Sequence, residues 1–354
     1  MFPGYFIAII SVYSLVFLVG FLGNVWVIWM LVIIRIDKKQ PVTSTFKRMN
    51  HYLLMLCVAD VLVLCMIPML VLYFLYGEWH LGFLMCKFFW TVENVNKLLS
   101  VALLTIMSLE RYMDICRPFN QHRKKQYRIC YILFAVILFI VFLCSPIIYY
   151  SDTTEHLILT GNNTIADVKV SCNSDLPDSV LPFFILYMCA FGFFVPVILI
   201  SLSSVLVVRR VHHQDSSLRR HSPLLSRSSR AIRSISSVVI FHFACWAPFW
   251  IAVLLTLIRT SHMREYLIIP PEVLAMMRLI TSFLPYINSA GNWIFYAALN
   301  RKIQNTSRQV RERHERLLEL DIDTTTTGMI IRALSVRKKG KGSVFQRAAN
   351  RRTV

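Results

Sequence analysis

The chain has few charged residues for its length, and acidic residues are especially scarce. Only 16% of its 354 residues are charged, with 19 acids against 38 lysines and arginines, while 56% are apolar. A soluble domain of this size has about a quarter of its residues charged. The composition therefore argues against an ordinary soluble domain and indicates a membrane protein.

Motifs of the common enzyme classes are also missing. The sequence contains no HExxH zinc motif, no nucleophile elbow and no glycine-rich phosphate loop. No internal repeat is visible either, although many secondary transporters are built from repeated halves. We therefore expect neither an enzyme nor a bound organic cofactor, and a transporter remains only the weaker alternative.

What the sequence does contain is a series of apolar runs, each about 20 residues or longer, which is the length of a transmembrane helix. Seven such runs predict an all-α membrane protein with a seven-helix bundle over residues 1–299. A short amphipathic helix on the membrane surface is expected over 300–320, and a disordered basic tail over 321–354. The predicted spans are residues 5–34, 52–76, 88–115, 129–150, 180–208, 235–258 and 273–299.

The distribution of charge predicts the orientation of these spans. Basic residues cluster in alternate loops and in the tail, whereas the loop over 151–179 carries five acids against Lys169 alone. By the positive-inside rule, the N-terminus lies outside and the C-terminus in the cytosol. This sorting also accounts for the net charge of +19 without any binding of nucleic acid.

The nine cysteines do not form a disulfide framework, because most of them lie within the predicted spans. Cys86 at the outer end of the third span and Cys172 in the acidic loop are the evident extracellular pair, and we expect a disulfide between them. Asn162 begins a glycosylation sequon in the same loop. Asn305 also begins one, but its predicted cytosolic position should keep it unmodified.

Short motifs stand in a fixed order along these spans, and their order and spacing resemble the rhodopsin-like (class A) G-protein-coupled receptors. Two longer stretches, "TVENVNKLLSVALLTIMSLERY" and "YINSAGNWIFYAAL", further resemble the somatostatin, opioid and allatostatin branch of peptide receptors. The short motifs are Gly23-Asn24, "LCVAD" ending at Asp60, "EWHLG" around Trp79, "ERY", "CWAP" and "NWIFY".

The resemblance implies a plasma-membrane receptor for an extracellular neuropeptide with a basic group, coupled to a heterotrimeric G protein of the inhibitory class. Arrestin, receptor kinases and membrane lipids are further implied partners. A non-signalling receptor that binds or scavenges peptide, and a receptor for a small amine, remain alternatives. The residues implied in coupling and switching are Glu110, Arg111, Tyr112, Phe119 and Tyr296.

The ligand site is implied by Glu93, which stands where the resembled branch carries a ligand-binding aspartate. Lys97 follows four residues later, a spacing that favours an ion pair within the helix. Glu93 therefore either binds a cationic group of the ligand or neutralises Lys97. The implied ligand-binding residues are Glu93, Lys97, Trp246, Phe249, Trp250, Arg278 and Tyr286.

A second polar site is expected around Asp60, because an acid near the middle of a membrane is costly without partners. The oxygen-bearing residues of three spans resemble the family's allosteric sodium pocket and suit a small hard cation. The alternative is a hydrogen-bonded cluster that holds the helices together without an ion. The residues of this site are Asp60, Asn96, Ser100, Asn288, Ser289 and Asn292.

Several family positions are altered, and they lie in the activation machinery. Trp293 replaces a proline, Ser204 stands where a tyrosine is usual, and His242 replaces a phenylalanine. Asp114, three residues after Arg111, is either a second acid that pairs with this arginine or a solvated acid. These changes keep the non-signalling alternative open.

Overall fold

The computed structural model describes residues 3–36, 44–116, 125–159, 165–217, 223–260 and 269–299, together with positions 312 and 316. The chain divides into two units, Met1–Val32 with Lys39–Asn300 and Ile33–Lys38 with Arg301–Val354. In the second unit, Arg316 Nε donates to the carbonyl oxygen of Glu312 at 3.2 Å. The predicted surface helix and tail otherwise lie outside the described residues. The site described below belongs to the first unit.

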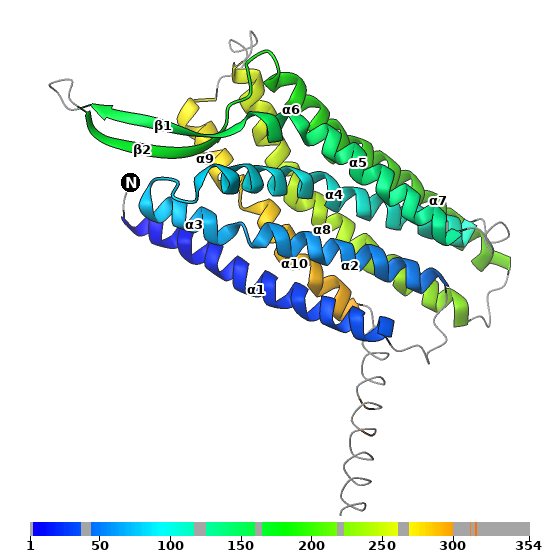
Figure 1. The fold of residues 1–354 in the computed structure, drawn as a ribbon. Coiled ribbons are helices and arrows are strands. Elements are labelled where there is room, and N and C mark those ends of the chain that lie inside the picture. Colours follow the sequence, from blue (N-terminus) through cyan, green and yellow to red (C-terminus); the bar gives the residue numbers. More distant parts are fainter. Residues whose placement is uncertain are drawn as a thin grey trace, which may run out of the picture. The chain divides into compact units, whose positions relative to one another are not determined.

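Seven helical spans in the described chain are long and apolar enough to cross a membrane, which confirms the predicted fold class. They are Ile7–Ile36, Arg48–Tyr76, Gly82–Cys116, Tyr131–Tyr150, Leu181–Arg210, Ser236–Arg259 and Pro271–Phe295. Several spans consist of more than one element (Figure 1). The helical elements are α1 (Pro3–Ile36), α2 (Ser44–Leu64), α3 (Ile67–Tyr76), α4 (Gly82–Cys116), α5 (Lys125–Tyr150), α6 (Leu181–Cys189), the π-helical turn η2 (Ala190–Phe194), α7 (Val195–Ser217), α8 (Pro223–Thr260), α9 (Pro271–Thr281) and α10 (Leu284–Leu299).

Helix α4, the third span, is the centre of the bundle. It contacts α2, α5, α7 and α8, so its side chains face most of the interior of the protein. This position explains why α4 buries polar residues along its length, including Asn94, Asn96, Ser100 and Ser108. Every site described below includes at least one residue of α4 or of the neighbouring α10.

Two spans are interrupted next to a proline. The second span breaks between α2 and α3 just before Pro68, and the seventh breaks at Ser282 and Phe283 just before Pro285. A proline has no N–H to donate and its ring crowds the preceding turn, which accounts for both positions. In the seventh span the helix resumes immediately before Tyr286, a predicted ligand-binding residue.

Helices α1 and α10 approach closely through small residues. A Cβ atom added at Gly20 would lie 2.7 Å from the Cβ of Ala290, and one added at Gly23 would collide with the ring of Trp293. Asn24 Nδ2 also donates to the carbonyl oxygen of Ser289 at 3.0 Å. The glycines therefore let the backbone of α1 pack directly against the seventh span.

The acidic loop over 151–179, which the charges predict to be extracellular, contains an antiparallel hairpin that the sequence analysis did not predict. Strand β1 (Ser151–Leu159) pairs with β2 (Ile165–Ser174), and Thr153 lies opposite Cys172 (Figure 1). The backbone N–H of Trp79 donates to the carbonyl oxygen of Val170 at 2.7 Å and so ties the first outer loop to β2. The predicted disulfide joins Cys86 of α4 to Cys172.

Candidate functional site

The outer half of the bundle brings together two residues that the sequence analysis assigned to the ligand. The hydroxyl of Tyr286, on α10, donates a hydrogen bond to Oε1 of Glu93, on α4. Tyr286 is buried against Tyr13 of α1, with the two rings edge to face and their centroids 5.7 Å apart. The carboxylate of Glu93 is therefore held by the first part of α10 after the helix break.

Lys97 does not form a direct ion pair with Glu93, one of the two alternatives that the sequence left open. Its ammonium group lies over the ring of Phe249, with Nζ 5.4 Å from the ring centroid. In the described part of the chain, no carboxylate lies within 4.0 Å of Lys97, and its ammonium group donates no hydrogen bond. Glu93 and Lys97 share a helix face, yet each turns to a partner on a different span.

Aromatic rings form the inner wall of this region. Trp246 and Trp250 are buried on α8, and both stand edge to face with Phe249, at centroid distances of 5.6 and 5.4 Å. Lys97 lies within electrostatic range of Glu93, which attracts it, and of Arg278, an exposed residue of α9, which repels it more weakly. The geometry thus places one acid, two cations and three aromatic rings around the outer ends of α4, α8 and the seventh span.

Buried polar residues of α2, α4 and α10 form two hydrogen-bonded pairs, which together with their polar neighbours are called the polar cluster below. Asn292 Nδ2 donates to Asp60 Oδ2 at 3.0 Å, and Ser100 Oγ donates to Asn96 Oδ1 at 3.2 Å. Four other oxygens, Oδ1 of Asp60, Asn288 and Asn292 and Oγ of Ser289, are buried without a hydrogen-bond partner among the described residues. Such oxygens are hard donors of the kind that small cations prefer, so the residues present fit a sodium ion.

His242 connects the aromatic wall with this polar cluster. Its ring is fully buried on α8, with its centroid 5.8 Å from that of Trp246. The side chain of Asn288 lies within electrostatic range of His242, but neither side chain makes a hydrogen bond of good geometry. His242 stands where the resembled family has a phenylalanine, so it places a polar ring between the ligand region and the polar cluster.

At the inner end of α4, two acids share one arginine of α2. Arg48 Nε donates to Glu110 Oε2 at 3.0 Å, and Arg48 Nη2 donates to Asp114 Oδ1 at 3.0 Å. All three side chains are nearly buried, with exposed fractions of 11%, 11% and 16%. The sequence analysis discussed both acids but did not name Arg48, which belongs to one of the basic clusters that predict the orientation.

The other predicted switch residues are partly outside the described chain. Arg111 and Tyr112 follow Glu110 on α4 and are partly exposed. Phe119 lies outside the described residues, as does the side chain of Tyr296 at the inner end of α10. The glycosylation prediction at Asn162 also falls on a residue that the structure does not describe.

The altered family positions have distinct surroundings. Ser203, not Ser204, faces α4, where its hydroxyl lies 2.7 Å from that of Ser108, while Ser204 is exposed. Trp293 packs against Gly23 and stands edge to face with Trp26, at a centroid distance of 6.4 Å. The residue that replaces the family's proline therefore interlocks the seventh span with α1.

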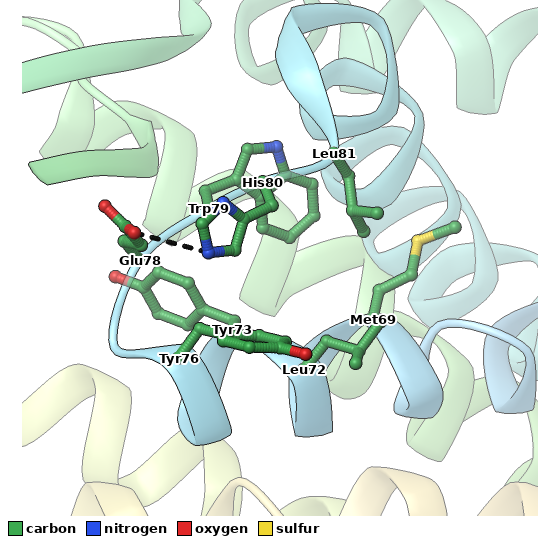
Figure 2. A pocket seen from close by; sticks show the side chains of 8 residues that line it. All are labelled: Met69, Leu72, Tyr73, Tyr76, Glu78, Trp79, His80 and Leu81. Atoms are coloured by element: carbon green, nitrogen blue, oxygen red, sulfur yellow. Dashed lines mark ion pairs between the residues drawn. The ribbon is translucent and has the colours of Figure 1, made fainter.

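A small cavity of about 40 Å³ lies apart from these sites, at the outer end of α3. Figure 2 shows the side chains of α3 facing those of the following loop, where His80 Nε2 lies 3.3 Å from Glu78 Oε1. None of its lining residues belongs to the Glu93 region. They are Met69, Leu72, Tyr73, Tyr76, Glu78, Trp79, His80 and Leu81.

Relatives of the chain are receptors. It is 29% identical to a probable G-protein coupled receptor of Caenorhabditis elegans over 84% of this chain and 67% of the relative. It is 25% identical to Neuropeptide receptor 18 of the same nematode over 83% of this chain, although the match spans only 64% of that relative. It is 28% identical to Somatostatin receptor type 1 of Rattus norvegicus over 93% of this chain and 78% of the relative.

The family model described as 7 transmembrane receptor (rhodopsin family) matches residues 23–296. This range begins at Gly23, ends at the last residue of the "NWIFY" motif and includes all or part of every predicted span. Its members are signalling receptors rather than enzymes. Because the match covers most of the chain and the described helices supply seven membrane spans, the protein is a multi-pass membrane receptor of the rhodopsin family.

Proposed function

We propose that this receptor binds an extracellular neuropeptide through a basic group and activates a heterotrimeric G protein of the inhibitory class. The observation that carries the proposal is the carboxylate of Glu93, which α10 holds through Tyr286 beside the aromatic wall of α8. A charged hydrogen-bond acceptor next to aromatic rings suits an ammonium or guanidinium group. The names of the relatives, a neuropeptide receptor and a somatostatin receptor, point to the same class of ligand.

Binding at this position can act on the whole bundle because it touches three helices at once. A basic group bound to Glu93 contacts α4, and the parts of the ligand next to it contact α8. The hydrogen bond between Tyr286 and Glu93 couples the same site to α10. A ligand that contacts these helices better in one packing than in another shifts the population toward that packing. The inner ends of the same helices, near Glu110 and Arg111, then present a different surface to the G protein.

The orientation that the charges predict places the ligand site outside the plasma membrane and the inner end of α4 in the cytosol. Arrestin and receptor kinases are proposed to act on the same cytosolic side, where the basic serine-containing loop and tail lie. Lipids of the inner leaflet are proposed partners of the basic segment after the seventh span.

A sodium ion is proposed as an allosteric ligand of the buried polar cluster. Asp60 and Asn292 would hold it, with Asn96, Ser100 and Asn288 around them. When bound, the ion would supply a positive charge that neutralises the Asp60 carboxylate. The protein contributes several buried side-chain oxygens that accept few hydrogen bonds from other protein groups.

One observation favours a second candidate, a receptor that binds peptide without activating a G protein. Trp293 fills the position of the family's proline and is packed into Gly23 of α1. Ser204 is exposed on α7 and points away from the bundle. Both features remove parts of the activation machinery that the family resemblance implies.

The test is G-protein activation in cells that express the full chain, across a panel of basic and cyclic neuropeptides that includes somatostatin. We expect a peptide response that Glu93→Gln weakens roughly ten- to hundredfold in potency, because a hydrogen bond to a charged group contributes about 1.5–3 kcal/mol. Arg111→Ala should abolish the response without loss of peptide binding. Glu272→Gln, an exposed acid at the start of α9, is the matched control and should respond as wild type.

Two outcomes would decide against the proposal. Peptide that binds to surface-expressed receptor without activating any G protein would establish the second candidate instead. A response that is unchanged in Glu93→Gln would show that the ligand's basic group, if it has one, does not bind this carboxylate.

A further inference from the structure

The most unusual feature of the ligand region is the ammonium group of Lys97. It lies inside the bundle on the central helix, and the ring of Phe249, 5.4 Å from Nζ, is its contact in the described chain. A cation–π contact contributes about 0.5–2 kcal/mol, while removing a charged group from water costs several kcal/mol. Lys97 is only partly exposed, so it has lost part of its contact with water, and the aromatic ring alone does not compensate that loss.

The neighbouring acid compensates this charge only in part, because the attraction between Glu93 and Lys97 acts without a direct ion pair. Glu93, one turn away on α4, accepts the hydrogen bond of Tyr286 and is not within ion-pair distance of Lys97. An ion pair between residues at this spacing on a helix is normally easy to form. Instead, the carboxylate of Glu93 contacts Tyr286, and the ammonium group of Lys97 contacts Phe249.

A second cation adds to the excess of positive charge. Arg278 of α9, an exposed residue, repels Lys97, although this effect is weaker than the attraction of Glu93. Among the described residues of this region, the charges are those of Glu93, Lys97 and Arg278, so two positive charges face one negative charge. An anion that binds Lys97 would therefore also be attracted by the positive charge of Arg278.

From these contacts we infer that the ligand carries a carboxylate, which binds Lys97, close to the basic group that binds Glu93. This inference rests on the proposed function in that it concerns the ligand of the same region. Residues one turn apart on a helix have their Cβ atoms about 5–6 Å apart, so the two ligand charges lie within about one residue of each other. Phe249 next to Lys97 favours an aromatic group beside the carboxylate.

The chemistry allows two sources for the carboxylate, the free C-terminus of a peptide or an acidic side chain. N-acetylphenylalanine supplies a C-terminal carboxylate next to an aromatic ring and has no amine that could engage Glu93. N-acetylaspartyl-phenylalaninamide supplies a side-chain carboxylate in the same context. N-acetylphenylalaninamide is the uncharged control that keeps the ring and removes the acid.

The experiment measures the thermal unfolding midpoint of the full-length receptor in lipid nanodiscs, at neutral pH and constant chloride. A ligand that binds only the folded protein raises this midpoint, by about 3 °C at roughly ten times its Kd. We expect a rise with at least one of the two acids and none with the uncharged amide. The acid that gives the larger rise identifies the source of the carboxylate.

Variants show whether Lys97 is the group responsible. Lys97→Met should remove the rise, and Lys97→Arg, which keeps the charge, should retain most of it. Lys87→Met is the matched control on the same helix, because Lys87 Nζ donates to the carbonyl oxygen of Ile148 at 3.0 Å and faces a different region. Each rise is measured against the ligand-free midpoint of the same variant, so a general loss of stability does not hide the result.

The inference is overturned if neither acid stabilises the wild-type receptor more than the amide does, or if the rise survives in Lys97→Met. Its failure is separate from that of the proposed function, because this measurement needs no G protein. An acid-specific rise that Lys97→Met removes, in a receptor that no peptide activates, would support the carboxylate site and refute the signalling proposal. Peptide-driven signalling without an acid-specific rise would support the signalling proposal and refute the carboxylate site.

Discussion

Arg48 shows what a residue-scale reading of the sequence can miss. It lies near the start of the second span, and from the sequence it is one of several basic residues on the cytosolic side. In the structure its two nitrogen donors bind Glu110 and Asp114, which lie four residues apart on α4. The pairing depends on how α2 and α4 pack, and local sequence does not carry that information.

The contacts of Arg48 predict a loss of stability when it is changed. Arg48→Gln leaves two nearly buried carboxylates without a cationic partner, which we expect to cost about 1–3 kcal/mol of folding free energy. Thermal unfolding of purified receptor measures it, with the exposed Arg209→Gln as the control. A double-mutant cycle with Asp114→Asn should give a coupling energy of about 0.5–3 kcal/mol, and additive effects would contradict a shared contact.

The sequence was enough to propose which residues form the ligand site, but not to predict which of them contact one another. The resemblance to peptide receptors identified Glu93, Tyr286 and the aromatic residues of α8, and the structure brings several of them into contact. The spacing of Glu93 and Lys97 suggested an ion pair, which the structure does not contain. Helical spacing says which side chains can meet, but the rotamers depend on residues of other spans, here Tyr286 and Phe249.

At the scale of elements, the apolar runs predicted all seven spans because their length and composition are local properties. The hairpin β1–β2 was not predicted, since its pairing joins two segments of a loop that was read only for its charge. The break before Pro285 was also missed. The sequence analysis considered the loss of a proline at Trp293 and did not ask where else the seventh span contains one.

The interlock of Trp293 with Gly23 predicts that α1 tolerates no larger residue at this glycine. A Cβ atom there would overlap the tryptophan ring, so Gly23→Ala should destabilise the receptor by about 1–3 kcal/mol through overpacking. Unfolding of the purified receptor is again the measurement. Trp293→Ala in the same chain should relieve the overlap, so that the double variant is more stable than the sum of the two single effects predicts.

A result in which Gly23→Ala leaves the unfolding midpoint unchanged would show that Trp293 rotates away at little cost. The close approach of α1 to α10 would then be less important for stability than the geometry suggests. Gly192 is a suitable reference for Gly23, because a Cβ atom added at Gly192 would lie 3.1 Å from Trp250 and would overlap it less. Gly192→Ala should therefore cost less than Gly23→Ala.

At the scale of the whole molecule, membership of the rhodopsin family follows from the order of many weak motifs across most of the chain. No single motif would have been enough, because short matches arise by chance. The membrane orientation is likewise predicted from the number of basic residues in all the loops together, and not from any one residue. The contacts between spans are the part that only the structure supplies.

The orientation leads to a prediction about the two sequons. With the N-terminus outside, Asn162 lies on the glycosylated side of the membrane and Asn305 on the cytosolic side. Receptor expressed in animal cells should therefore migrate faster on a gel after treatment with an N-glycosidase. Asn162→Gln should remove that shift, while Asn305→Gln, the matched control, should leave it intact. A shift that depends on Asn305 instead would mean that the seven spans cross in the opposite sense, which would place Glu93 and Lys97 on the cytosolic side and refute an extracellular ligand at this site.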